Sequence, residues 1–364
     1  MREFLFILLA VSAASSRSHS NWCELGCDCR GDLRFTICSR AFFTELPGRI
    51  PSNTELLDVS HNRIVVIPER SFNKNRKLRV LLLQNNNISV VQDGAFSQLE
   101  FLQKLDLSWN RIATLDKGFS MGLAFLRELQ LAHNSLSSLD SSSFTHLESL
   151  QKLNLSGNSI RNIQVRSFAS MSSLRHLHLE GNRLTSLNNG IFSMLRSLEL
   201  LNLAGNHINE TQAGIFKPLT SMTLLNLANN RLTSIYFKTF LSIHTYSTHI
   251  LLEGNPWNCD CDLQRVFGKL SSIQRLFLDD YYNLTCAQPT ALRNIRLIQV
   301  DTELCIAETV TVLIITVTVV ITVLAAMLMG ERKRKRKKRR STGRSRESYQ
   351  TSRTTDIDPF HFPL

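Results

Sequence analysis

LQKLDLSWNRI (Leu102–Ile112), LRELQLAHNSL (Leu126–Leu136) and LQKLNLSGNSI (Leu150–Ile160) are consecutive stretches of this chain that share one pattern. The pattern is L-x-x-L-x-L-x-x-N-x-L, and its asparagine returns every 24 residues, with a last interval of 25. The asparagines are Asn62, Asn86, Asn110, Asn134, Asn158, Asn182, Asn206, Asn230 and Asn255. A fixed period of this length indicates a repeat array in which each turn of chain stacks on the next.

Each repeat is expected to contribute one short strand. In Leu105-Asp106-Leu107 the period of two places the leucines on one face of a strand and the aspartate on the other. The asparagine follows at the turn, where its amide can satisfy neighbouring backbone groups, so the stacked asparagines predict a hydrogen-bonded ladder. A phenylalanine recurs at nearly the same phase and predicts a continuous buried spine. These residues are Phe72, Phe96, Phe119, Phe144, Phe168, Phe192, Phe216 and Phe240.

The repeats resemble the extracellular leucine-rich repeat family, in which 24-residue turns build a curved solenoid with a parallel sheet on its concave side. The resemblance covers about four fifths of the chain. It implies an α/β solenoid, a horseshoe with a parallel concave β-sheet, in which residues 51–247 form eight 24-residue turns. The leucines and phenylalanines are then core residues and no ligand site is expected among them.

The two ends of the array are expected to carry caps. Residues 1–20 are predicted to be a signal peptide, because Phe4–Val11 is an apolar run behind Arg2 and small residues follow it. Export permits disulfides, and the eight cysteines form two sets outside the repeats: Cys23, Cys27, Cys29 and Cys38, then Cys259, Cys261, Cys286 and Cys305. We expect cross-linked caps at residues 21–50 and 248–306 to cover the ends of the core.

Cysteine spacing alone leaves three connectivities in each set. A zinc site is the rival interpretation, which secretion and the lack of a second C-x2-C disfavour. The spacings also resemble the cap modules of the leucine-rich repeat family. That resemblance implies the pairs Cys23 with Cys29, Cys27 with Cys38, Cys259 with Cys286, and Cys261 with Cys305.

A patch of mixed charge is predicted on the concave face. The residues six, four and two positions before each asparagine should point outward, and the middle strands place charges there between apolar flanks. The candidate contact residues are Lys104, Asp106, Glu128, Gln130, Lys152, His176, His178 and Glu180. Such a patch suits a protein partner better than a polyanion, although a solvated sheet face is the alternative. A metal could be considered at His176, His178 and Glu180. Three ligands in a row on one strand are too extended for a tight site, however, so no metal is expected.

Four sequons predict N-glycosylation of an exported chain: Asn87, Asn154, Asn209 and Asn283. Asn154 belongs to an outward column of the concave sheet. A glycan there would project over the middle of the face and move any broad partner to the ends or flanks of the solenoid.

A transmembrane helix is predicted at residues 309–330, because these 22 residues hold no charge and span about 33 Å as a helix. The basic cluster follows: Arg332, Lys333, Arg334, Lys335, Arg336, Lys337, Lys338, Arg339 and Arg340. Positive charge stays on the cytoplasmic side, so we expect a single-pass type I plasma-membrane protein with an extracellular ectodomain. The cluster should lie on anionic inner-leaflet lipid. Residues 331–364 are predicted to be a basic disordered cytoplasmic tail, which carries +8 of the net charge of +12, and no nucleic-acid partner is expected.

Two functions fit this organisation. The capped ectodomain, single span and short tail resemble trophoblast-glycoprotein-type surface proteins, which implies an adhesion or receptor-like protein that recognises an extracellular protein. The same organisation is similar to the gamma auxiliary subunits of potassium channels, which implies a channel partner reached through residues 309–330 and 332–340; this chain departs by about two more repeats. No catalytic triad, carboxylate pair or phosphate-binding glycine loop stands out, so neither an enzyme nor a cofactor is expected.

Overall fold

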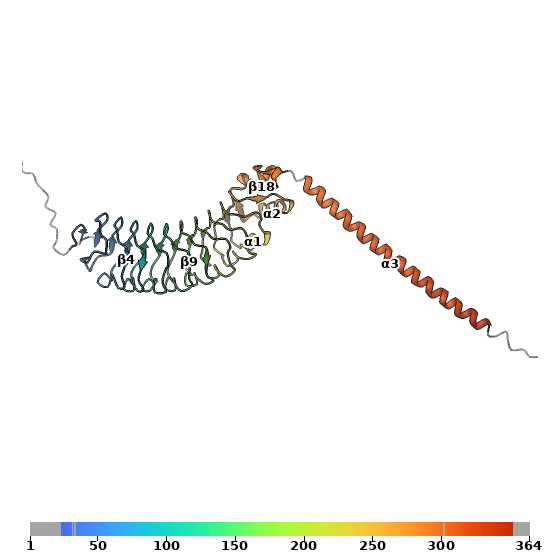
Figure 1. Cartoon of the computed structure of the whole chain (residues 1–364), viewed down its shortest axis with the longest axis horizontal. Coiled ribbons are helices and arrows are strands. Elements are labelled where there is room, and N and C mark those ends of the chain that lie inside the picture. The colour runs from blue at the N-terminus through green and yellow to red at the C-terminus, as the bar shows by residue number, and fades with distance from the viewer. Residues whose placement is uncertain (1–22, 31, 33, 301–302, 352–364) are drawn as a thin grey trace, which may run out of the picture. The chain divides into compact units, whose positions relative to one another are not determined.

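The computed structural model describes residues 23–30, 32, 34–300 and 303–351 (Figure 1). The chain divides into two units, residues 1–300 and residues 301–364, and each is described by itself. The predicted signal peptide, residues 1–20, lies outside the described residues.

The first unit is built on one sheet of 12 strands. Its order is β1 (Asp28–Arg30), β2 (Phe35–Ile37), β3 (Leu56–Asp58), β5 (Val80–Leu82), β7 (Lys104–Asp106), β8 (Glu128–Gln130), β10 (Lys152–Asn154), β12 (His176–His178), β13 (Leu200–Asn202), β14 (Leu224–Asn226), β15 (Thr248–Leu251) and β17 (Leu276–Leu278). Only the β1–β2 pair is antiparallel within this described sheet. Lys104 pairs with Glu128 and Glu128 with Lys152, so residues at equal phase form columns across the strands.

The remaining elements are short. Three two-stranded pairs lie outside the main sheet: β4 (Val66–Ile67) with β6 (Val90–Val91), β9 (Ser138–Leu139) with β11 (Asn162–Ile163), and β16 (Trp257–Asn258) with β18 (Cys286–Gln288). The helices are α1 (Phe237–Leu241), α2 (Cys261–Ser271), η1 (Tyr281–Asn283), η2 (Thr290–Leu292) and η3 (Leu297–Gln299). Because most turns lack a long helix, the stacked sheet supplies most of the regular structure of the unit.

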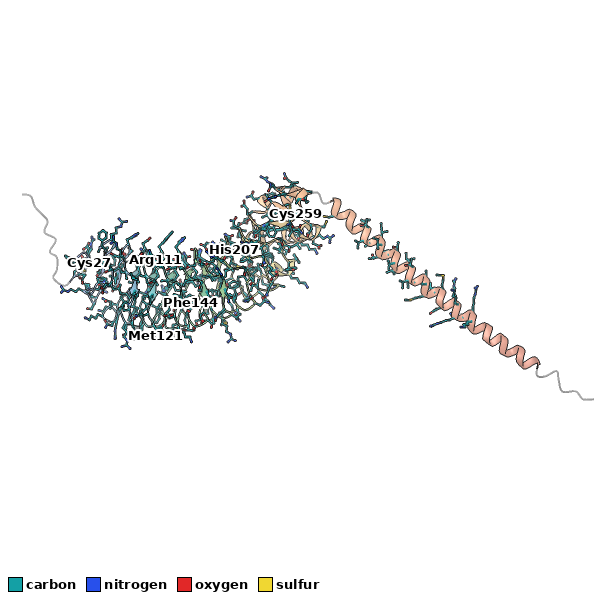
Figure 2. All side chains as sticks on the ribbon, viewed as in Figure 1. Cys27, Arg111, Met121, Phe144, His207 and Cys259 are labelled. Atoms are coloured by element: carbon teal, nitrogen blue, oxygen red, sulfur yellow. A yellow bond between two sulfur atoms is a disulfide. The ribbon has the colours of Figure 1, made fainter. Side chains whose placement is uncertain are left out.

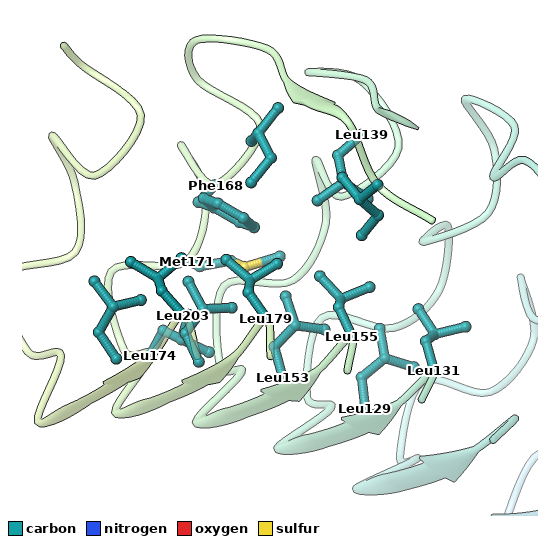
Figure 3. Close-up of a cluster of buried hydrophobic side chains, with 14 of the residues drawn as sticks. Leu129, Leu131, Leu139, Leu153, Leu155, Phe168, Met171, Leu174, Leu179 and Leu203 are labelled. Carbon is teal, nitrogen blue, oxygen red and sulfur yellow. The ribbon is translucent and has the colours of Figure 1, made fainter. Parts of the chain in front are cut away.

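The core is continuous from turn to turn. Figure 3 shows Leu129, Leu153 and Leu179 pointing from the sheet into the interior, where Phe168 and Met171 lie, and all five side chains are fully buried. The predicted phenylalanine spine is present, since its eight members are each at most 1% exposed. In Figure 2 the labelled Phe144 lies inside the solenoid, between Arg111 at one edge and Met121 at the other.

The asparagine ladder links each turn to its neighbour. Asn134 Oδ1 accepts a hydrogen bond from the backbone N–H of Ile112 at 3.0 Å, and Nδ2 donates to the carbonyls of Leu107 and Leu131 at 2.9 and 3.1 Å. The other ladder asparagines make equivalent bonds, as in Asn158 and Asn182. A short amide at this turn thus pairs buried backbone groups that would otherwise be left without partners.

Disulfides close both ends of the first unit. The structure contains Cys23–Cys29, Cys27–Cys38 and Cys259–Cys286, which are three of the four pairs that the family resemblance implies. Cys261 and Cys305 are also disulfide-bonded, and no free cysteine remains among the described residues.

The C-terminal end of the core is covered by α2. Asp260 caps this helix by accepting a hydrogen bond from the N–H of Leu263 at 2.8 Å. The helix buries Leu263, Phe267 and Leu270 on one face, and the Phe267 ring packs edge-on against the buried Trp257 at 5.6 Å. A solenoid needs such a cover because its last turn has no following repeat to bury its leucines.

The second unit consists of the helix α3 (Glu303–Thr351). Within the part of the chain that the structure describes, its segment Val310–Lys337 is the one helical stretch long and apolar enough to cross a membrane. The hydroxyls of Thr316, Thr318 and Thr322 donate to backbone carbonyls three residues earlier at 2.8 Å, so these polar groups are satisfied within the helix.

The sequence predicts a disordered tail over residues 331–364, whereas the structure continues α3 through residues 331–351. Lysine, arginine, glutamate and glutamine, which are common in this stretch, have good intrinsic helix propensity, and no proline interrupts it. Composition alone therefore did not mark the end of the helix. Residues 352–364 lie outside the described residues.

Candidate functional site

The predicted contact residues share one face of the main sheet. Along β8 the side chains of Glu128 and Gln130 are half-buried, whereas Leu129 between them is fully buried, as the period of two requires. The structure brings together the eight residues that the sequence singled out, all half-buried: Lys104, Asp106, Glu128, Gln130, Lys152, His176, His178 and Glu180. We call this surface the concave patch.

Glu128 lies at the centre of the concave patch between two lysines. Its Oε1 is 3.3 Å from Lys104 Nζ and 4.0 Å from Lys152 Nζ, and it accepts a hydrogen bond from Gln130 Nε2 at 2.8 Å. Partial burial raises the pKa of Glu128, but the Gln130 hydrogen bond and the two ammonium groups outweigh burial and hold the pKa below its ordinary value. The negative charge of Glu128 at the centre of the patch is therefore balanced by groups within the patch.

Other residues of the concave patch also lie beside polar neighbours in or next to the patch. Asp106 Oδ1 accepts hydrogen bonds from the Ser108 N–H at 2.9 Å and from the Ser108 hydroxyl at 2.6 Å. His176 Nε2 lies 3.9 Å from a Glu199 oxygen, and His178 Nδ1 lies 3.5 Å from Glu180 Oε1. Over residues 23–300 and 303–351, as far as they are described, no cluster of three or more His, Cys, Asp or Glu side chains has the arrangement of a metal site.

The four sequons differ in accessibility. Asn209 and Asn283 are exposed, and Asn87 is half-buried. Asn154 is half-buried in β10, where its Oδ1 accepts a hydrogen bond from the Ser156 N–H at 3.0 Å, beside the concave patch. Glycosylation of these asparagines stays a prediction, and Asn154 is the position where it would obstruct the patch.

A second surface, which the sequence analysis did not single out, lies on the flank of the sheet. It is a hollow of about 360 Å³. Its lining residues are Phe101, Gln103, Phe125, Arg127, Ser149, Gln151 and Ser173. They stand seven and nine positions before the ladder asparagines, on four adjacent turns. We call this surface the flank hollow.

The feature of the sequence that marks the flank hollow is a pair of phenylalanines at a position that is polar in the neighbouring repeats. Phe101 and Phe125 occupy the same position in consecutive repeats, and their side chains are 58% and 60% exposed. The equivalent residues of the neighbouring repeats are polar: Lys77, Ser149, Ser173 and Ser197. A comparison of equivalent columns, rather than a search along one strand, would have identified the site.

An exposed ring stack marks the turn at the opposite end of the same strands. The rings of Trp109 and His133 stack at 3.8 Å with an interplanar angle of 16°, although Trp109 is 55% exposed. Both residues adopt positive φ, and Gly157 occupies the same position in the next repeat. A Cβ at Gly157 would lie 2.6 Å from the His133 ring, so the glycine leaves room for the stack.

Comparison with known proteins agrees with this architecture. The family described as "Leucine rich repeat" matches residues 52–112, 102–160 and 149–208. Rat leucine-rich repeat-containing protein 4 is 33% identical over 79 residues, which cover 22% of this chain and 12% of the rat protein. A Xenopus tropicalis leucine-rich repeat and immunoglobulin-like domain-containing nogo receptor-interacting protein 1 is 34% identical over 67 residues, 18% of this chain and 11% of that protein. The chain thus aligns with a small part of these relatives.

Solved structures extend the similarity over most of the chain. Human trophoblast glycoprotein, also called Wnt-activated inhibitory factor 1, matches with a TM-score of 0.60 and 26% identity, over 78% of this chain and 98% of that one. The leucine-rich repeat structure in the complex of latrophilin 3, Unc5D and FLRT2 matches with a TM-score of 0.56 and 26% identity, over 77% and 98% of the two chains.

Proposed function

Because the chain belongs to the leucine-rich repeat family, we propose that it is a cell-surface binding protein whose solenoid recognises an extracellular protein. The repeats supply a rigid scaffold on which columns of side chains hold constant spacing. No active-site arrangement is needed for this role, since the function resides in surface contact.

The observation that supports the proposal best is the concave patch. It combines charged and polar side chains on four adjacent strands, β7, β8, β10 and β12, which hold them in register. Side chains held in register on a parallel sheet lose little conformational freedom when a partner binds. The solved complex of FLRT2 with latrophilin 3 and Unc5D shows one leucine-rich repeat protein of similar fold assembled with other proteins.

The helix α3 supports attachment to a membrane. We propose a single-pass type I arrangement at the plasma membrane, with residues 309–330 in the bilayer and the basic cluster 332–340 against anionic lipid on the cytoplasmic side. The cap disulfides, among them Cys23–Cys29, Cys27–Cys38 and Cys259–Cys286, suit an oxidising, extracellular environment for the solenoid.

The test is proximity labelling on living cells. The full-length protein is compared with the same ectodomain carried on an unrelated membrane anchor. The proposal expects both proteins to label the same main partner, because binding resides in the solenoid.

Loss of the main partner with the foreign anchor would overturn the proposal. If that partner were a multi-span channel, function would be assigned instead to residues 309–330 and the cluster 332–340, as an auxiliary channel subunit requires. Neither the relatives nor the solved structures named above favour that outcome.

A further inference from the structure

The column of residues seven positions before the ladder asparagines is fixed by backbone hydrogen bonds. The Arg127 N–H donates to the Gln103 carbonyl and the Gln151 N–H donates to the Arg127 carbonyl, each at 2.8 Å. The Arg175 and Glu199 N–H groups continue this chain of bonds at the same distance. Side chains in this column therefore project from neighbouring turns at a spacing of about 4.8 Å.

Charges in this column are paired at both ends. Glu55 lies between Arg34 and Arg79, and its Oε2 is 3.2 Å from Arg79 Nε. Toward the other end, Arg175 Nη1 is 2.7 Å from Glu199 Oε1.

Arg127 is the exception in the middle of the column. Its column neighbours are Gln103 and Gln151, which are uncharged. Glu100 and Glu148, which precede the lining residues Phe101 and Ser149 in the sequence, make no ion pair with it, nor does any other acid that the structure describes. An exposed guanidinium with five donors thus faces the flank hollow without an acidic partner.

The surroundings of Arg127 are amphipathic. Phe101 and Phe125 present exposed rings to the flank hollow, and two glutamine amides and two serine hydroxyls complete its lining. Aromatic rings and arginine are the side chains most enriched at the centres of protein interfaces, where amides can bind the backbone of a partner.

The dimensions of the flank hollow favour an extended peptide. Its lining comes from four adjacent turns, which span about 14 Å at 4.8 Å per turn. An extended chain rises about 3.3 Å per residue, so roughly four residues cover this length.

We propose that the flank hollow binds an extended segment of the protein partner in which an Asp or Glu stands next to an aromatic or aliphatic residue. The carboxylate pairs with the Arg127 guanidinium, and the apolar side chain lies on Phe101 and Phe125. The inference rests on the proposed function, because it names the segment by which an extracellular partner is recognised.

The experiment uses full-length protein in lipid nanodiscs and a phage library of random seven-residue peptides flanked by glycines. The variants are Arg127→Gln, which turns the column into three consecutive glutamines, and Arg175→Gln as the matched control outside the hollow. We expect selected peptides to carry an acid beside an apolar residue and to bind Arg127→Gln at least tenfold more weakly than the wild type. Arg175→Gln should bind like the wild type.

Exchanging the peptide acid for its amide supplies the second measurement. It should weaken binding to the wild type at least tenfold and change binding to Arg127→Gln little, because the two changes remove the same ion pair. Peptides that bind Arg127→Gln and the wild type equally, or a library without any binder, would overturn the inference. Self-association that Arg127→Gln abolishes, with no acidic peptide selected, would also overturn it by assigning the hollow to a second copy of this chain.

Failure of this inference is distinguishable from failure of the proposed function. In the proximity-labelling experiment, a partner captured equally by the wild type and Arg127→Gln would keep the solenoid as the binding element and reject the flank hollow alone. A partner lost with the foreign anchor would reject the proposed function whatever the peptides show.

Discussion

The concave patch and the flank hollow belong to the same repeats but differ in how their charges are paired. Glu128 in the patch is held between two lysines and a glutamine, whereas Arg127, the preceding residue, has no acidic partner within the structure as described. Arg127 lies just before β8 and does not follow the alternation of the strand: Glu128 projects from the sheet face, whereas Arg127 is exposed and lines the flank hollow.

The difference shows why charge density alone is a poor guide to a binding surface. A pre-paired patch must exchange internal contacts for contacts with a partner, so each of its charges adds less to affinity than an unpaired charge would. An unpaired arginine beside exposed aromatic rings has fewer contacts to lose.

Leaving aside substitutions of buried leucines, the largest effect is expected at Asn134, whose turn supports both surfaces. Asn134→Ala removes the amide that pairs the Ile112 N–H and the carbonyls of Leu107 and Leu131, and it leaves these buried groups without partners. We expect the free energy of unfolding to fall by about 2–4 kcal/mol. Thermal unfolding of the full-length protein, followed by tryptophan fluorescence, measures the change. Ser135→Ala, at an exposed neighbour, is the control; equal stability of the two variants would contradict the role assigned to the ladder.

The second prediction removes the pairing of the concave patch. Glu128→Ala leaves Lys104 and Lys152 without their shared acid, and a pair of unpaired lysines attracts polyanions. We expect the variant to elute from heparin at higher salt than the wild type. Glu148→Ala makes the same change in net charge at an exposed site outside the patch and should shift elution less. Identical elution of the two variants would show that net charge alone governs retention.

The third prediction uses pH to separate the two surfaces. The pKa of Glu128 in the folded protein lies below its ordinary value of 4.5, so its ion pairs stabilise the fold above pH 4.5 and this contribution is lost as pH falls through the lowered pKa. The stability difference between the wild type and Glu128→Gln should therefore shrink below pH 4.5. The difference for Arg127→Gln should stay constant, because Arg127 has no titrating partner. Denaturant unfolding across pH 3–7 measures both; parallel curves would reject the contrast.

The smallest effect is expected at the rim of the flank hollow. Phe125→Ser should change the free energy of unfolding by at most about 0.5 kcal/mol, because the ring is mostly exposed. Leu126→Ala, at the next and fully buried residue, should cost about 2–5 kcal/mol. A large loss of stability in Phe125→Ser would make this ring a core residue and remove it from the proposed binding surface.

The sequence determined the solenoid because its information is periodic and local. The alternation around each ladder asparagine specified which residues face the core, and Leu129 and Glu128 accordingly lie on opposite sides of one strand. A 24-residue register then placed the eight concave-patch residues together without further knowledge of the fold. The helix α3 followed from an uncharged apolar stretch, although its end at Thr351 did not.

Only the tertiary structure decided which surface residues have partners. Whether a charge is paired depends on side-chain rotamers and on residues 24 positions away, as between Arg175 and Glu199. Lys104 and Arg127 carry the same charge in the sequence. In the structure Lys104 has an acid at 3.3 Å, whereas Arg127 faces a hollow lined in part by phenylalanines. Stacking of the turns converts residues that are distant in the chain into one surface, and that step creates the flank hollow.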